Sequence, residues 1–202
     1  MAEEEKKEAP EQDQTGKNGI LLYLHDLTIL LAVILLVFTF LFRIVVVSGS
    51  SMYNTLVDGD WLLILSNTIS GEPEYGDIIV ASKDSFNYGE PIIKRVIATE
   101  GQTVDIDFEL GIVYVDGVAL EEEYIYSPTT DDEGMDFPLV VDEGCVFAMG
   151  DNRGRSSDSR NPAIGLIDER EILGRAFFLV FPGTGEYPFV NERDFDRIGA
   201  LK

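Results

Sequence analysis

The pattern of hydrophobic residues changes abruptly near residue 47. From Thr28 to Phe42 the run TILLAVILLVFTFLF contains no charge. Counted on to Val47, the stretch holds about 20 mostly apolar residues, which is enough to cross the hydrocarbon core of a bilayer. We therefore predict one transmembrane helix over residues 20–47. Residues 1–19 lack apolar periodicity and are predicted to form a disordered polar tail.

A cleavable secretory signal is the alternative interpretation of this run, with Ser48 and Ser50 as small residues at a cleavage site. The run is longer than the apolar region of a usual signal, and the tail before it is acidic rather than basic. These two features favour a retained membrane anchor. The few basic residues before the run determine its orientation only weakly.

Beyond residue 47 the apolar runs become short and are separated by Gly, Pro, Asp and Asn. Such runs, rich in Val, Ile and Phe, are typical of β-strands. They are DWLLIL, DIIVA, PIIKRVIA, GIVYVDGVAL, CVFAMG and GRAFFLVF. Asp116 and Gly117 predict a tight hairpin turn, and YSPTTDDEGMDFP predicts a surface loop. Residues 48–202 should form a mainly β domain of coiled antiparallel sheets or a barrel, although residues 183–202 show no interpretable pattern.

Charge and composition exclude several classes of function. The 37 acidic and 15 basic residues give a net charge of −22, which argues against a nucleic-acid partner because phosphate binding needs clustered Lys and Arg. The lone Cys145 cannot form an internal disulfide. One Cys and one His provide no zinc ligand set, and the carboxylates lack the spacing of a calcium loop, so no metal or other cofactor is expected.

Serine paired with lysine is the remaining candidate for nucleophilic chemistry. The single histidine, His25, lies at the start of the predicted span, so a serine–histidine–aspartate triad is implausible. Lys83 lies in a polar loop and should stay hydrated, and Lys202 is terminal. Lys94 alone stands among isoleucines, where burial can lower its pKa toward the range of a general base. A strand lysine that extends to water remains the alternative.

A polar stretch, MGDNRGRSSDSRNP from Met149 to Pro162, follows an apolar run and predicts a hydrogen-bonded shelf or, alternatively, a solvated turn. Three earlier stretches accompany it: SGSSMYNTL, YGDIIV and IIKRVIATEGQTV. The four stretches, in this order along the chain, resemble the motifs of the bacterial type I signal peptidases. These are membrane-bound serine proteases with a serine–lysine dyad. The resemblance extends to about Pro182 and is closest to the compact Gram-positive forms.

The resemblance implies that Ser51 is the nucleophile and that Lys94 is its general base. It also implies that Ser156 forms a hydrogen bond with the Lys94 amine and orients it. Some members add a hydroxyl donor to the oxyanion hole two residues before the nucleophile, but here that position is Gly49. Asn54 also replaces the usual proline of the serine motif.

The resemblance further implies that Asp151 pairs with Arg95, and that Asp158 and Arg160 hold the shelf beside the dyad. The substrates would be the signal peptides of secretory precursors, cut on the extracytoplasmic side of the bilayer. The precursor would bind as an added β-strand with small residues at the first and third positions before the cut. Five residues are predicted to form the walls of these shallow pockets: Val47, Met52, Leu56, Val80 and Ile93.

Two alternative functions remain. A catalytically inactive, membrane-tethered relative that serves in the assembly of surface structures would keep the fold without the reaction. Self-cleaving repressors of the SOS type share the serine–lysine arrangement, but they are cytoplasmic and bind DNA. The predicted span and the net charge of −22 oppose this second alternative.

Overall fold

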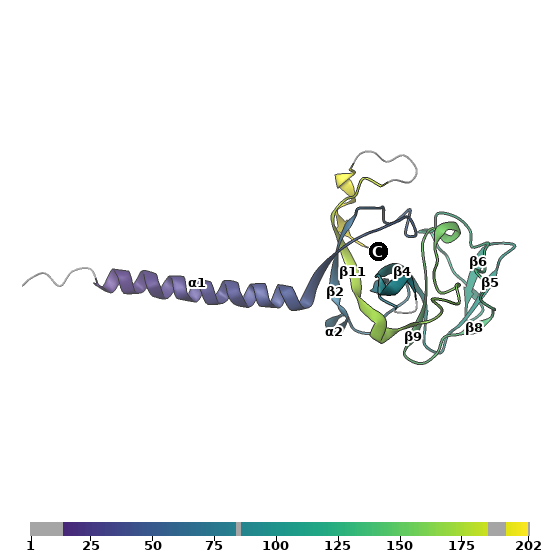
Figure 1. The fold of residues 1–202 in the computed structure, drawn as a ribbon, viewed down its shortest axis with the longest axis horizontal. Coiled ribbons are helices and arrows are strands. Elements are labelled where there is room, and N and C mark those ends of the chain that lie inside the picture. Colours follow the sequence, from purple (N-terminus) through teal and green to yellow (C-terminus); the bar gives the residue numbers. More distant parts are fainter. Residues whose placement is uncertain (1–13, 84–85, 186–192, 202) are drawn as a thin grey trace, which may run out of the picture. The chain divides into compact units, whose positions relative to one another are not determined.

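Helix α1 and the β-rich remainder of the chain form two separate compact units that divide between Phe40 and Leu41. A computed structural model describes residues 14–83, 86–185 and 193–201. In Figure 1 the chain is coloured from purple at its N-terminus to yellow at its C-terminus.

Helix α1 extends over Gln14–Leu41. Its portion Gly19–Leu41 has a mean hydropathy of 2.5 and none of it is buried, so it is long and apolar enough to cross a membrane. The predicted span of residues 20–47 is too long at its C-terminal end, because Phe42–Val46 form strand β1, whose β-branched residues pair with a neighbouring strand. The predicted disordered tail lies outside the described residues up to 13, and residues 14–19 belong to the helix.

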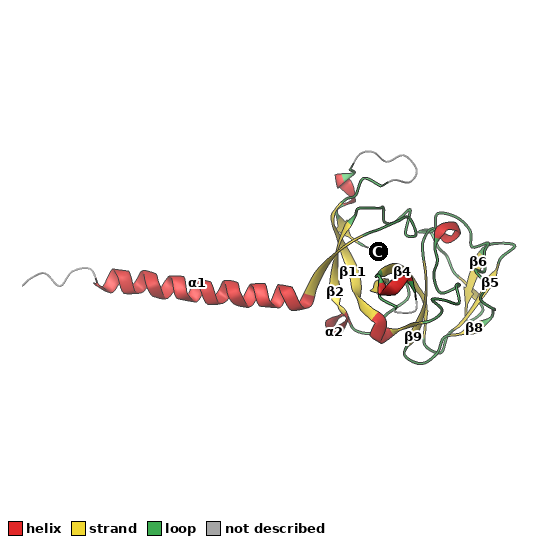
Figure 2. Ribbon diagram, viewed as in Figure 1, coloured by secondary structure: helices red, strands yellow, loops and turns green. Residues whose placement is uncertain are grey.

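The β domain contains a large, curled antiparallel sheet and a small one, as predicted (Figures 1 and 2). In spatial order the large sheet comprises β1, β2 (Trp61–Ser66), β11 (Ile172–Phe181), β3 (Ile78–Ala81), β4 (Ile92–Thr99), β9 (Cys145–Met149) and β10 (Ile167–Asp168), and β12 (Gly199–Ala200) also pairs with β11. The small sheet comprises β7 (Val118–Ala119), β6 (Ile112–Val115), β5 (Thr103–Asp107) and β8 (Leu139–Val140). Figure 1 shows it on the opposite side of the β domain from β2 and β11.

Short helical segments occupy the connections between strands. They are α2 (Asn67–Ser70), η1 (Asn87–Gly89), η2 (Arg153–Arg155), η3 (Glu169–Glu171) and η4 (Phe195–Arg197). All six apolar runs named above contain a strand, and the Asp116-Gly117 turn joins β6 to β7 with both residues at positive φ, as predicted. The loop predicted from YSPTTDDEGMDFP contains no strand.

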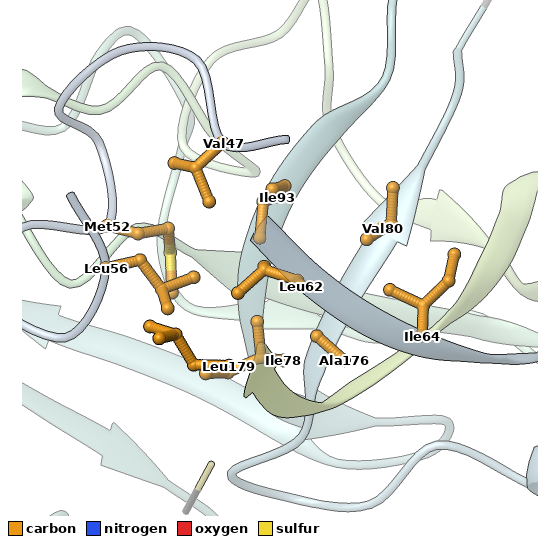
Figure 3. Packing of buried hydrophobic residues seen from close by; sticks show 10 residues of the cluster. All are labelled: Val47, Met52, Leu56, Leu62, Ile64, Ile78, Val80, Ile93, Ala176 and Leu179. Atoms are coloured by element: carbon orange, nitrogen blue, oxygen red, sulfur yellow. The ribbon is translucent and has the colours of Figure 1, made fainter. Parts of the chain in front are cut away.

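The β domain buries its apolar side chains in three clusters among the described residues. Figure 3 shows one of them, built from β2, β3, β4, β11 and the segment after β1. Strand β4 is central in the large sheet, and six consecutive residues, 93–98, are buried on its two faces. A polar side chain on β4 is therefore removed from water by the fold itself.

Candidate active site

Ser51 and Lys94 lie together, although 43 positions separate them in the sequence. Lys94 Nζ is 2.9 Å from Ser51 Oγ, within hydrogen-bond distance. Strand β4 holds Lys94 through its pairing with β3, in which Lys94 is opposite Ile79. Ser51 lies in the turn after β1, and this turn is partly exposed. The arrangement places a hydroxyl at a surface and an amine behind it.

Burial changes the acid–base behaviour of Lys94, whose residue surface is only 4% exposed. Loss of hydration lowers the pKa of the Lys94 amine to about 8, because the charged form is disfavoured away from water. The negative charges of Asp158, Glu133 and Asp151 oppose this shift, and the Arg160 guanidinium adds to it. Burial is the largest of these influences, so a substantial fraction of the amine is neutral near pH 8.

The serine turn is held by the stretch that follows β9. The Asn152 backbone N–H donates to Ser51 O at 2.9 Å, and the Asn152 side-chain amide donates to Ser50 O at 3.0 Å. Gly150 allows this close approach, because a Cβ at position 150 would lie 2.4 Å from Ser51 O and 2.2 Å from Ser156 Oγ. The polar stretch from Met149 to Pro162 is therefore a largely buried support for the serine turn rather than a solvated turn.

Gly49 has a left-handed backbone with φ of +88° that other residues rarely adopt. Its backbone N–H donates to Asp58 Oδ1 at 2.7 Å. Gly49 thus shapes the turn before Ser51 and cannot contribute a side-chain donor to an oxyanion hole.

Arg95 and Asp151 form a buried pair beside the dyad. Arg95 Nε donates to Asp151 Oδ1 at 2.9 Å and Nη2 donates to Oδ2 at 2.8 Å. The Thr55 hydroxyl donates to the same carboxylate at 2.5 Å, and Arg95 lies 4.1 Å above the Tyr124 ring. The pair ties β4 to the stretch after β9 and to the turn after Ser51.

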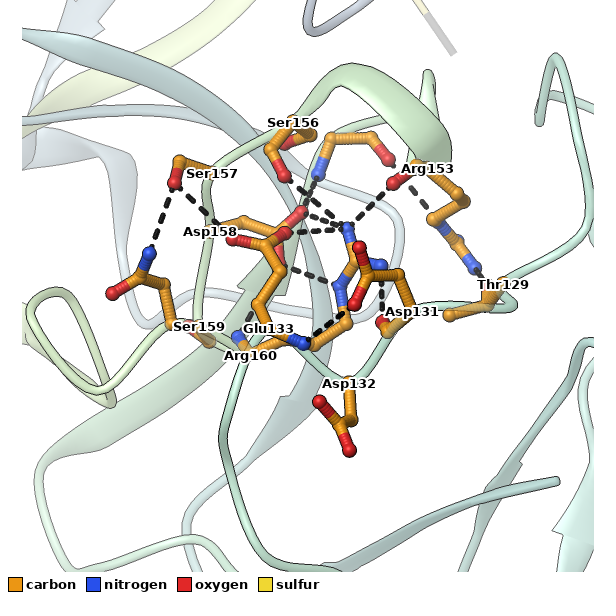
Figure 4. Close-up of polar contacts among 12 residues, drawn as sticks. Thr129, Asp131, Asp132, Glu133, Arg153, Ser156, Ser157, Asp158, Ser159 and Arg160 are labelled. Carbon is orange, nitrogen blue, oxygen red and sulfur yellow. Dashed lines mark hydrogen bonds and ion pairs between the residues drawn. The ribbon is translucent and has the colours of Figure 1, made fainter. Parts of the chain in front are cut away.

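Asp158 and Arg160 form the second buried pair, shown in Figure 4. Arg160 contacts Asp158 at 2.8 and 2.9 Å and Glu133 at 3.1 Å, and Asp158 Oδ2 accepts from Gly150 N at 3.0 Å. Burial alone would raise the pKa of the Asp158 carboxyl, but the hydrogen bonds and charge of Arg160 hold it below its ordinary value. Asp158 therefore stays ionised beside Gly150.

The structure lacks the hydrogen bond between Ser156 and Lys94 that the resemblance implies. Ser156 Oγ is buried and has no hydrogen-bond partner among the described residues. Its hydroxyl lies against Gly150, which has no side chain to displace it. Ser156 is thus close to the serine turn, but no hydrogen bond joins its hydroxyl to the Lys94 amine.

A cleft of about 400 Å³ extends from the dyad, with Ser51 and Lys94 in its lining. Of the five residues predicted to form substrate pockets, Val47, Met52 and Ile93 line this cleft, together with Val45 and Ile92. Leu56 and Val80 do not line it. Both are completely buried in the cluster of Figure 3, because their side chains point into the core behind the cleft wall.

The sequence did not predict the contacts of several residues near Ser51 and Lys94. Thr55, Asn152 and Arg153 lie inside the quoted motifs, but nothing in those motifs indicated their partners. Arg153 is buried and contacts Glu122 at 2.5 Å and Thr129 at 2.6 Å. Lys83, expected to stay hydrated, has a side chain that is 19% exposed, and its amine donates to Leu166 O at 2.6 Å and lies 3.6 Å from Glu171. Within the described ranges, no cluster of His, Cys, Asp or Glu has the arrangement of a metal site.

The chain is similar in sequence to known proteins. "Signal peptidase I" of Bacillus licheniformis is 34% identical over 180 residues, which cover 85% of this chain and 94% of that protein. "Probable signal peptidase I-1" of Synechocystis sp. is 38% identical over 160 residues, covering 73% and 78% of the two chains.

The crystal structure of a signal peptidase I from Enterococcus faecalis V583 covers 52% of this chain and 96% of its own, with 30% identity and a TM-score of 0.43. A family model described as "Signal peptidase, peptidase S26" matches residues 20–181. This match and the extent of the relatives' identity show that the chain belongs to the signal peptidase family, peptidase S26.

Proposed function

We propose that this protein is a membrane-bound serine endopeptidase that removes N-terminal signal peptides from exported precursors, with Ser51 as nucleophile and Lys94 as general base. The observation that carries the proposal is the 2.9 Å approach of a buried amine to a partly exposed serine hydroxyl. An ammonium cannot accept a proton, whereas an amine with a pKa of about 8 is substantially neutral at mildly alkaline pH.

The reaction needs only this pair and water. Neutral Lys94 Nζ takes the proton of Ser51 Oγ while Oγ bonds to the carbonyl carbon of the scissile peptide. The Lys94 ammonium then protonates the leaving amine as the C–N bond breaks, and the signal peptide remains esterified to Ser51. Lys94 next takes a proton from water, the resulting hydroxide attacks the ester, and the proton returns to Ser51 Oγ as the signal peptide leaves.

The surrounding residues support these steps in two ways. Asn152 and Gly150 hold the serine turn, and the Arg95–Asp151 and Arg160–Asp158 pairs join that turn to β4 and to the support. The narrow apolar wall of Val47, Met52 and Ile93 suits small side chains before the cut, and the exposed backbone of β1 at the sheet edge suits a precursor that binds as an added strand.

The alternative, an inactive tethered relative, would have lost the base or its burial. Ser51, Lys94 and the two buried ion pairs are all in place, which favours the enzyme. Helix α1 and the relatives named above are consistent with a membrane anchor that keeps the catalytic domain close to its substrates at the extracytoplasmic surface.

The test uses the full chain in detergent with a secretory precursor. We expect cleavage at the signal-peptide junction by the wild-type protein, and a loss of at least about 10³-fold in rate for Ser51→Ala. Ser70→Ala, in helix α2, is the matched control and should cleave like wild type. A precursor that stays intact with the wild-type protein, while an authentic signal peptidase cleaves it, would favour the inactive relative.

A further inference from the structure

The C-terminal segment Arg193–Leu201, yellow in Figure 1, lies beyond the residues that the family model matches. It nevertheless belongs to the β domain. Strand β12 pairs with β11, Leu201 N donates to Phe177 O at 2.9 Å, and Leu201 packs against the cluster of Figure 3. The segment is therefore attached to the sheet at its end, which leaves the short helix η4 close to the turn that follows the nucleophile.

Arg197 of η4 contacts a carboxylate in that turn. Arg197 Nη2 and Nη1 donate to Asp60 at 2.6 and 3.0 Å, and Nη2 also donates to the Thr55 carbonyl at 3.2 Å. Asp60 is completely buried, whereas the Arg197 side chain is 23% exposed. Such a bidentate pair fixes both partners in position, because the planar guanidinium matches the two carboxylate oxygens.

Asp60 gathers several parts of the chain around itself. Its carboxylate accepts from Val57 N at 2.8 Å and from Gly183 N at 2.7 Å, in addition to Arg197. Gly183 fits against the turn so closely that a Cβ there would lie 2.1 Å from Asp58 O. The turn over residues 55–60 is thus held by Gly183 and by Arg197 of the C-terminal segment.

The turn 55–60 also forms hydrogen bonds with the backbone of residues 47–49, which precede Ser51. Val47 N donates to Asp60 O at 2.8 Å, Gly59 N donates to Val47 O at 2.9 Å, and Gly49 N donates to Asp58 Oδ1 at 2.7 Å. On its other side the serine turn is held by Asn152. The position of Ser51 Oγ relative to Lys94 therefore depends on two supports.

We propose that Arg197 is a positioning residue for the reaction: through Asp60 and the turn 55–60 it clamps the C-terminal segment onto the serine turn and aims Ser51 at Lys94. This inference rests on the proposed function, since it concerns the same dyad. A displacement of the order of 1 Å in a reacting group can reduce the rate about 100-fold, so a loosened clamp should be visible in kcat.

The experiment compares Arg197→Ala, Arg197→Lys and the control Arg193→Ala in the full chain in detergent. Arg193 belongs to the same segment, but its side chain donates to Pro182 O and lies over the Phe181 ring, and both of these partners are outside the turn 55–60. For each protein, kcat and KM for a precursor, the pH dependence of kcat and the rate of Ser51 acylation by a serine-directed reagent are measured. Circular dichroism at the assay temperature determines the folded fraction, to which kcat is normalised.

We expect Arg197→Ala to lower kcat and the acylation rate by about tenfold to 100-fold per folded molecule, with KM changed less than about twofold. The pH midpoint should stay in place, because Arg197 does not contact Lys94. Arg197→Lys, which keeps one charged donor for Asp60, should recover part of the loss, and Arg193→Ala should resemble wild type.

The clamp would be overturned if Arg197→Ala had the same kcat per folded molecule as Arg193→Ala. A decrease in the measured rate that unfolding fully explains would overturn it as well. If Arg197→Ala does not fold, Arg197→Lys decides: wild-type kcat and acylation would overturn the inference, and a selective decrease in both would support it. Failure of the proposed function is distinct, because the wild-type protein would then not cleave the precursor at all.

Discussion

Lys94 and Arg95 are adjacent residues of strand β4 and both are buried, but among the described residues only Arg95 has an ion-pair partner. They point to opposite faces of the strand, as successive strand residues do. Arg95 is met by both oxygens of Asp151 at 2.8 and 2.9 Å. Lys94 forms no ion pair among the described residues, and its near neighbour is the neutral hydroxyl of Ser51.

The difference accounts for the separate roles that we propose for the two side chains. Arg95 is paired with a carboxylate and joins parts of the site together. Lys94 is buried and has no ion-pair partner among the described residues. Burial therefore disfavours its charged form and lowers the pKa of the amine to about 8. The same strand thus carries a paired cation on one face and an amine with a lowered pKa on the other.

The largest expected decrease in the rate of precursor cleavage comes from replacing Lys94 with arginine, the residue type of its neighbour Arg95. Lys94→Arg keeps a cation of similar length but cannot be deprotonated, so precursor cleavage should fall by about 10³-fold or more. The matched exchange, Arg95→Lys, keeps a charge beside Asp151 and should reduce the cleavage rate less than about tenfold. Initial rates with one precursor measure both. Comparable losses in the two variants would show that Lys94 has no special role as a base.

The opposite change removes the partner of Arg95. Asp151→Asn leaves the guanidinium buried without its countercharge and should lower the free energy of unfolding by about 3 kcal/mol. Chemical denaturation of the full chain in detergent measures this loss. Asp168→Asn is the control, because its partner Arg170 is 89% exposed, and the denaturation midpoint should not change. An unchanged midpoint for Asp151→Asn would contradict the structural role assigned to the pair.

The smallest effect is a shift along the pH axis. With Lys94 at a pKa of about 8, kcat/KM should rise about tenfold per pH unit below that value and level off above it, because only the neutral amine accepts a proton. Glu133→Gln should move the midpoint to lower pH, since the Glu133 carboxylate raises the pKa of Lys94. Asp132→Asn, in the same loop, is the control.

Initial rates from pH 6 to 10 measure the profile. A flat profile would remove Lys94 as the base. A higher pH midpoint in Glu133→Gln than in the wild-type protein would contradict the effect of the Glu133 carboxylate on the pKa of Lys94.

Much of the fold could be predicted from local patterns. The apolar run before residue 42 and the short strand-like runs after it depend on side-chain type and spacing alone, which act through neighbouring residues. The end of the helix was misplaced because Phe42–Val46, apart from Arg43, are apolar like a membrane span, and their pairing with β2 makes them a strand. Strand β5 was missed because its sequence, TVDID, alternates with acidic residues and lacks a clear apolar run.

The sequence by itself determined which groups were available: one reactive pairing of serine with lysine, an apolar setting for Lys94, and a polar stretch rich in arginine and carboxylates. Tertiary structure alone decided how far Ser51 lies from Lys94, that Ser156 faces Gly150, that Leu56 and Val80 lie behind the cleft, and that Arg197 reaches Asp60. The reason is physical. Burial and pairing depend on which distant segments pack together, and the local sequence pattern does not contain that information.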